Sequence, residues 1–196
     1  QAIEGLSQAK LGSVRLAVTP SVAQTVLPPV LLQFMQDHPN VRIDLRDMDS
    51  AAVAEELTHD RADIGLASIA ALPGFERQTL FSDAFGVVCR ADHPLSQNWH
   101  DLNWTDLQGV DFIANGLCAQ ITDEAFQPVL EAARLTVRNT ASLLGLVQAG
   151  MGLTLLPRLA VLPGFSDLCF LPLRDTTVRR TVWMVTPPRQ MVPPAV

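Results

Sequence analysis

Charged residues are scarce in this sequence, and no long apolar run takes their place. Only 17% of the 196 residues are charged, against roughly 25% in an average soluble protein. The 48% hydrophobic content is enough for a substantial core and excludes disorder for most of the chain. A membrane helix needs about 18 consecutive apolar residues, and Gln33 and Gln36 interrupt even the most apolar stretch. Because a signal-peptide pattern is also missing at the N-terminus, we expect a soluble, cytoplasmic protein without a membrane partner.

Basic residues are also few: the chain has 14 Lys and Arg residues against 20 Asp and Glu residues. The formal net charge is −6 and the sequence pI is about 5.1. Nonspecific nucleic-acid binding requires a basic face that contacts phosphates. We therefore expect these residues not to bind DNA themselves.

The sequence has few of the residue patterns that carry chemistry. Its three cysteines, Cys89, Cys118 and Cys169, are widely spaced and form no CxxC pair, so they predict buried free thiols and neither a disulfide framework nor a zinc site. A redox role for Cys118 is a minor alternative. No GxSxG, HExxH, phosphate-binding glycine loop or paired-carboxylate motif occurs. We expect no catalytic residue, no metal ligand and no cofactor.

The first third of the chain alternates strand and helix patterns. Strands are predicted at residues 13–19, 41–47 and 62–67. Helices are predicted between them: one carries an apolar stripe from Leu27 to Met35, and another follows Ser50, which is the expected cap. This β-α-β-α-β order predicts parallel strands with crossover helices.

The same alternation restarts after an irregular stretch that ends near Gly109. Strands are predicted at 110–114, 135–138 and 152–157, with an amphipathic segment at 122–133 and a helix at 141–149. Further strands at 84–90 and 180–186 bracket this second set. The sequence therefore predicts an α/β fold of two Rossmann-like lobes joined by two crossing strands. Lobe I takes residues 12–86 and 182–196, and lobe II, residues 87–181, is inserted into it.

Polar residues stand where several predicted strands end. Thr19, Pro20 and Ser21 follow the first strand, and Asn139 and Thr140 follow a strand of the second lobe. Ligands in open parallel sheets bind outside the carboxyl ends of strands, where helix N-termini present unpaired N–H groups. Two such helix starts would make a cleft for a small anionic ligand. The alternative is that they are ordinary capped helices that never face each other.

Two further polar strand ends are candidates for the lining of this cleft. Ser68 ends the strand at 62–67, and the turn Asn115-Gly116 follows the strand at 110–114.

Four segments in order carry a resemblance to a known family: RLAVTPSVAQTVLPPVLLQFMQDHPNVRIDL, RADIGLA, FGVVCRADHPL and LLGLVQAGMGLTLLP. Over residues 12–190 the chain resembles the effector-binding domain of LysR-type transcriptional regulators. The resemblance implies a fold similar to type 2 periplasmic binding proteins, with the effector between the lobes. Residues 1–11 then resemble the tail of a linker helix that follows an N-terminal winged helix-turn-helix.

The resemblance also implies site residues and partners. By position in the family pattern, the effector contacts are Thr19, Ser21, Val22, Ser68, Asn115, Gly116, Leu117, Cys118, Asn139 and Thr140. It implies dimers through these domains, tetramers of the whole regulator, and DNA contact only through the N-terminal domain. The helix from Leu27 to Met35 is then expected to serve both core and dimer interface.

Two other functions remain open from the sequence. A solute-binding protein of a transport system would have the same two-lobed cleft. An enzyme is a third possibility, because some enzymes use related folds, but the missing motifs disfavour it.

Overall fold

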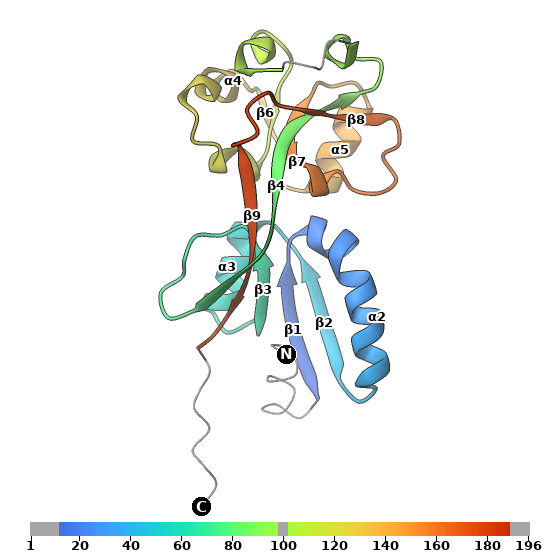
Figure 1. The fold of residues 1–196 in the computed structure, drawn as a ribbon, viewed down its shortest axis with the longest axis vertical. Coiled ribbons are helices and arrows are strands. Elements are labelled where there is room, and N and C mark those ends of the chain that lie inside the picture. Colours follow the sequence, from blue (N-terminus) through green and yellow to red (C-terminus); the bar gives the residue numbers. More distant parts are fainter. Residues whose placement is uncertain (1–11, 98–101, 189–196) are drawn as a thin grey trace, which may run out of the picture. The chain divides into compact units, whose positions relative to one another are not determined.

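A computed structural model describes residues 12–97 and 102–188 (Figure 1). The predicted linker-helix tail, residues 1–11, lies outside the described residues. Contacts divide the chain into two compact units. Among the described residues, unit 1 holds 12–19, 29–81 and 182–188, and unit 2 holds 20–28, 82–97 and 102–181.

Unit 1 is built on three parallel strands, β1 (Ser13–Val18), β2 (Arg42–Asp47) and β3 (Ile64–Ala67). β1 lies between β2 and β3, with Val18 opposite both Asp47 and Leu66. Residues 183–185 of β9 (Arg179–Thr186) pair antiparallel with β3. The mixed α/β class predicted from the alternating pattern is therefore confirmed.

Two helices complete unit 1: residues 29–37 of α2 (Leu27–Asp37), and α3 (Ser50–Thr58). α3 packs Val53 and Leu57 into a cluster with Ala17, Ala62 and Val185. The expected cap of α3 is wrong by one residue. Asp49 accepts the hydrogen bond from the Ala52 N–H at 2.8 Å, because its extended backbone places the carboxylate over the first turn.

Unit 2 contains the other strands and helices. Residues 85–90 of the long strand β4 (Glu76–Arg90) pair antiparallel with β7 (Thr154–Pro157) and with β8 (Leu168–Pro172). β5 (Ile113–Ala114) and β6 (Leu135–Thr136) form a separate parallel pair. The helices are α4 (Gln127–Glu131) and α5 (Thr140–Gln148). Short 3-10 turns span Pro94–Gln97, Trp104–Leu107, Gly116–Gln120, Glu124–Phe126 and Arg158–Ala160.

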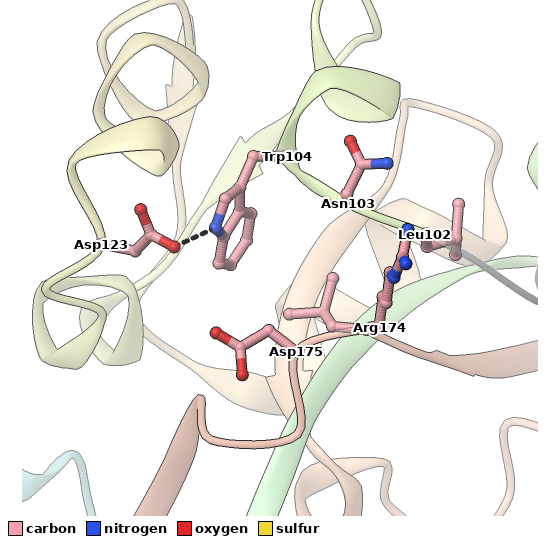
Figure 2. Close-up of a pocket in the computed structure, with 7 residues that line it drawn as sticks. Leu102, Asn103, Trp104, Asp123, Arg174 and Asp175 are labelled. Carbon is pink, nitrogen blue, oxygen red and sulfur yellow. Dashed lines mark hydrogen bonds between the residues drawn. The ribbon is translucent and has the colours of Figure 1, made fainter.

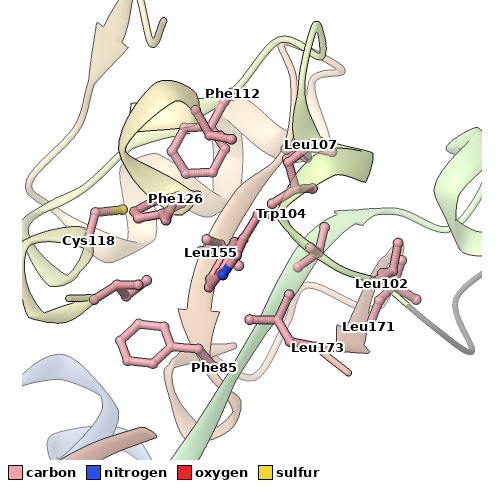
Figure 3. Packing of buried hydrophobic residues seen from close by; sticks show 14 of the residues in the cluster. Phe85, Leu102, Trp104, Leu107, Phe112, Cys118, Phe126, Leu155, Leu171 and Leu173 are labelled. Carbon is pink, nitrogen blue, oxygen red and sulfur yellow. The ribbon is translucent and has the colours of Figure 1, made fainter. Parts of the chain in front are cut away.

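The largest core cluster lies in unit 2 (Figure 3). Phe126 is central to it: its ring centroid lies 5.0 Å from that of Trp104 and 5.7 Å from that of Phe112. A second cluster buries Leu143, Leu144 and Val147 of α5. Burial of large side chains contributes about 1.5–3 kcal/mol each, so unit 2 has the apolar content to hold its loops in place.

Candidate functional site

The polar turn after β1 begins a helix, but its serine does not cap it. Helical geometry starts at Pro20, where a proline loses no needed donor. Ser21 stands before one turn of π-helix, η1 (Val22–Val26), and its side chain makes no capping hydrogen bond. Thr19 and Ser21 are only 5% and 3% exposed. The structure therefore gives the Ser21 hydroxyl a role other than capping.

Two consecutive prolines account for the wide helical turn that follows. Pro28 and Pro29 have no N–H, and in a regular α-helix each ring would clash with the carbonyl four residues earlier. The Leu27 N–H instead reaches back to the carbonyl of Val22, five residues away, which is the π-helical pattern. Single π turns inside α-helices occur often at functional sites. The prolines thus set the geometry of the turn that carries Ser21.

A buried arginine lies beside this serine. Arg180, on β9, is 1% exposed, and its Nη1 donates to Ser21 Oγ at 3.0 Å. Its Nε and Nη2 donate to the two carboxylate oxygens of Asp83, each at 2.9 Å. Asp83 Oδ2 also accepts from the backbone N–H of Leu159 at 2.9 Å. All of these residues belong to unit 2, so the cluster is defined within one unit.

Thr19 and Ser68 mark one polar edge, in unit 1. They follow β1 and β3, which are parallel neighbours with Val18 opposite Leu66. The Thr19 N–H donates to the Leu66 carbonyl at 3.0 Å. Ser68 is half-buried, and its N–H donates to Ser50 Oγ at 3.2 Å. The structure therefore brings these two predicted residues to the same end of one sheet.

Asn115 and Asn139 mark a second polar edge, in unit 2. Asn115 follows β5 and Asn139 lies three residues after β6, and these strands are parallel, with Ala114 opposite Thr136. The Val137 N–H donates to the Ala114 carbonyl at 2.9 Å and extends the pairing. The sequence predicted polar strand ends in both lobes, and each unit presents one.

The side chain of Asn115 holds the fold at this edge. It is 6% exposed, and its Nδ2 donates to Thr154 Oγ1 at 3.0 Å and to the Leu155 carbonyl at 2.9 Å. Its Oδ1 accepts from the Leu117 N–H at 2.9 Å. Because the amide is committed to three bonds, its contribution to a site is to fix the backbone of the turn.

Other predicted residues of this edge differ in access. Gly116 is exposed and Leu117 half-buried, whereas Cys118 is 1% exposed and belongs to the core cluster of Figure 3. Burial raises the pKa of the Cys118 thiol to about 11. Asn139 is exposed and caps α5 by accepting from the Ser142 N–H at 2.9 Å, and Thr140 begins the helix. Capping is therefore confirmed for Asn139.

Two cavities lie elsewhere in unit 2. One, of about 370 Å³, is lined by Leu102, Asn103, Trp104, Asp123, Leu173, Arg174 and Asp175 (Figure 2). In it the Trp104 indole N–H donates to Asp123 at 2.5 Å. The other, of about 410 Å³, is lined by Ala91, Ser96, Arg158, Cys169, Phe170, Leu171 and Pro172. Neither cavity is lined by a residue that the sequence predicts to bind a ligand.

Comparison with known proteins decides the family. The family model described as the LysR substrate binding domain matches residues 7–196. The chain belongs to this family. The resemblance seen in the sequence is thereby confirmed, and so is the fold similar to periplasmic binding proteins.

The relatives of this LysR substrate-binding domain are named as transcriptional regulators. The chain is 26% identical over 191 residues to the uncharacterized HTH-type transcriptional regulator YbhD of Escherichia coli, covering 94% of this chain and 60% of that protein. It is 29% identical over 167 residues to the transcriptional activator protein LysR of Escherichia coli, covering 82% of this chain and 53% of that protein. The chain thus spans 53% to 60% of the length of these relatives. They are regulators and not enzymes, which supports the expectation that the chain is not an enzyme.

Solved structures of LysR-type regulators share the fold. The effector-binding domain of a BenM variant superposes with a TM-score of 0.77 at 24% identity, covering 91% of this chain and 87% of that chain. The BenM effector-binding domain with its effector benzoate superposes with a TM-score of 0.72 at 24% identity, covering 92% and 85%. At this identity the likeness concerns the fold alone.

Arg180 contacts a predicted site residue of this LysR substrate-binding domain, Ser21, and the sequence did not predict that contact. No basic residue stands between Thr19 and Val22, so the sequence near this turn gives no sign of a cation beside Ser21. The segment RRTVWMV did contain an indication. Its second arginine, Arg180, lies two residues before the fully buried Val182, so the two side chains point to the same face of the strand. An arginine in phase with buried residues indicates a paired buried charge.

The described residues show neither a metal cluster nor a membrane span. Across residues 12–97 and 102–188, no three His, Cys, Asp or Glu side chains are grouped so that they could hold a metal ion. In the same part of the chain no helix is both long and apolar enough to cross a membrane.

Proposed function

We propose that this domain binds a small anionic effector at the polar strand ends of its two units. The observation that carries the proposal is the hydrogen bond from Arg180 to Ser21 Oγ at 3.0 Å. It places a guanidinium beside a predicted contact residue, in surroundings where both side chains are nearly removed from water. A hydroxyl that accepts a charged hydrogen bond is polarised and becomes a stronger donor in its turn. Ser21 is therefore suited to donate to an anion.

The ligands of structurally similar domains support this class of effector. The BenM domain was solved with benzoate, and the QuiR domain, with a TM-score of 0.74 at 14% identity, was solved with shikimate. Both ligands are small carboxylates. Backbone N–H groups at strand ends and at helix starts suit such an anion, and Gly116 leaves the backbone exposed at the second polar edge.

The predicted contact set follows from these positions. We propose that the effector contacts the turn Thr19 to Val22 and Ser68, together with the turn Asn115 to Cys118, Asn139 and Thr140. Cys118 and Asn115 contribute through their backbone, because their side chains are buried in unit 2.

Regulation requires that the effector distinguish two states of the protein. A ligand shifts an equilibrium only by its unequal affinity for the two states. We propose that the effector favours one arrangement of the two units, and that the change passes to an N-terminal DNA-binding domain of a whole cytoplasmic regulator. β4 and β9 suit this role, because each contributes residues to both units.

Thermal denaturation with candidate ligands tests the effector proposal. The probes are benzoate and shikimate, with benzamide as a neutral partner of benzoate. A ligand at 100 times its dissociation constant adds about 2.7 kcal/mol to the free energy of unfolding. We expect a carboxylate to raise the melting temperature of the wild type and of Ser142→Ala, a matched exposed serine at the start of α5. The shift should be lost in Ser21→Ala.

The outcomes separate the parts of the proposal. An equal shift in Ser21→Ala and the wild type would show that the effector does not use this turn. Stabilisation by benzamide equal to that by benzoate would refute selection of an anion.

Self-association is the second part of the proposed function. Val30, Leu32 and Met35 of α2 are 46%, 65% and 53% exposed, and Leu45 of the neighbouring strand β2 is 39% exposed. We name these four residues the α2–β2 face. Large apolar side chains left exposed on neighbouring elements are candidates for an interface with a partner. We propose that a second copy of this chain covers the α2–β2 face, in line with the dimer that the family resemblance implies.

A further inference from the structure

Two cysteines far apart in the sequence face each other in unit 2. Cys89 lies on β4 and Cys169 on β8, and the antiparallel register places them directly opposite. Their sulfur atoms are 3.6 Å apart, and both thiols are free. Opposed residues on antiparallel strands have Cα atoms about 4.5 or 5.5 Å apart, and both values lie in the range that a disulfide spans. We propose that Cys89 and Cys169 form a reversible disulfide.

The two thiols differ in access to solvent. Cys89 is fully buried, and burial raises the pKa of its thiol to about 12. Cys169 is half-buried and lines the 410 Å³ cavity together with Ser96 and Arg158. A small oxidant can therefore reach Cys169 from the cavity, whereas Cys89 is shielded. Cys169 is the residue that reacts first, and Cys89 is the resolving thiol.

The reaction balances with a peroxide as the oxidant. The Cys169 sulfur attacks one oxygen of hydrogen peroxide, the O–O bond breaks, and the products are a sulfenic acid and water. The Cys89 sulfur then attacks the Cys169 sulfur, the S–O bond breaks, and the hydroxyl leaves as water with the Cys89 proton. Two thiols are oxidised and one peroxide is reduced to two waters. A dithiol reductant reverses the bond by thiol–disulfide exchange.

The site is separate from the proposed effector contacts. Cys118, the third thiol, is buried in the core cluster and is not a partner in this pair. The Cys169 thiol contacts the Cys89 and Arg90 carbonyls at 3.5 and 3.8 Å, so it is held against β4 rather than turned away from it. The new bond would join β4, which reaches both units, to β8.

Oxidation of the whole 196-residue chain tests the proposal. The chain is treated with a small excess of hydrogen peroxide, remaining thiols are alkylated after denaturation, and peptides are analysed by mass spectrometry without reduction. We expect loss of two of three thiols per chain and one cross-linked peptide pair containing Cys89 and Cys169, which dithiothreitol removes. Cys118→Ala should give the same cross-link.

Variants and alternative products keep the test decisive. In Cys89→Ala we expect the Cys169 sulfenic acid to persist and to be trapped by dimedone, with no intramolecular cross-link. Conversion of Cys169 in the wild type to sulfinic acid without a cross-link would overturn the proposal. So would a disulfide between two chains through Cys169 in place of the bond to Cys89.

Discussion

The pairing of Arg180 with Asp83 is the most consequential contact at the residue scale. Both side chains are nearly removed from water, and the guanidinium binds the carboxylate through two 2.9 Å hydrogen bonds. Removing one partner of a buried ion pair leaves an uncompensated charge. The same pair also holds the donor that contacts Ser21, so stability and the proposed site depend on it together.

We expect Asp83→Ala to lower the free energy of unfolding by about 3–5 kcal/mol, because it leaves the Arg180 charge buried and unpaired. Urea denaturation measures the change. The matched control is Asp92→Ala, which removes an exposed partner of Arg90 and should change stability by less than about 1 kcal/mol. Similar losses in the two variants would mean that the Arg180 charge is not desolvated.

A second residue-scale prediction concerns Cys118. Burial raises the pKa of its thiol to about 11, and only the thiolate reacts with alkylating agents. At pH 8 the thiol is protonated and shielded, so iodoacetamide should modify half-buried Cys169 well before Cys118 in the native chain. In urea the order should disappear. Rapid native alkylation of Cys118, followed by mass spectrometry, would show instead that this side chain is open to ligands.

The sequence predicted which strand ends are polar but not what each side chain does there. Asn139 was a candidate ligand contact or a cap, and the structure shows the cap. Ser21 had the same two roles, and the structure shows a bond to Arg180 instead. Local spacing distinguishes neither case, because the deciding partner of Ser21 lies on β9, far along the chain.

At the element scale, buried strands were predictable and surface elements less so. β3 and β7 are short, mostly apolar runs that are buried along their whole length, as the sequence pattern predicts. β8 was not predicted, because its short run LCFLP lacks alternation and ends in proline. The sequence pattern also did not predict the π-helical turn before α2. That turn depends on how Pro28 and Pro29 restrict the backbone of the residues before them, and apolar spacing does not report this.

The turn before β7 offers an element-scale prediction. Gly152 has a φ of +147°, and a Cβ there would lie 2.1 Å from the Asp111 carbonyl oxygen. That backbone is fixed by the hydrogen bond from the Leu153 N–H to the same carbonyl at 2.9 Å. We expect Gly152→Ala to cost about 3 kcal/mol or more, at the upper end of overpacking effects.

The control for this prediction is Gly109→Ala. Gly109 has a φ of +76° and open space around the added Cβ, so only backbone strain of about 1–2 kcal/mol applies. Urea denaturation compares the two variants. Equal costs would show that the loop holding Asp111 shifts to accommodate the methyl group.

At the scale of the whole molecule, the α2–β2 face predicts self-association that single charges can break. We expect Leu32→Asp to weaken a dimer by tenfold or more in sedimentation velocity, because it places a charge in a desolvated interface. Leu32 is 65% exposed, so the free energy of unfolding of the monomer should change by less than about 0.5 kcal/mol. Leu80→Asp, at another exposed leucine, is the control. A dimer unaffected by Leu32→Asp would place the interface elsewhere.

The return of β9 to unit 1 has a consequence for folding during synthesis on the ribosome. β3 pairs with β9 through Gly65 and Val185, so the entire inserted segment is translated between the two partners. Until β9 emerges, β3 has an open strand edge of the kind that pairs with other chains and aggregates. Unit 2 can meanwhile close its own clusters, since domains generally fold as units during synthesis. The strands of unit 1 that are made early thus wait for β9, and this interval is when a chaperone would be needed most.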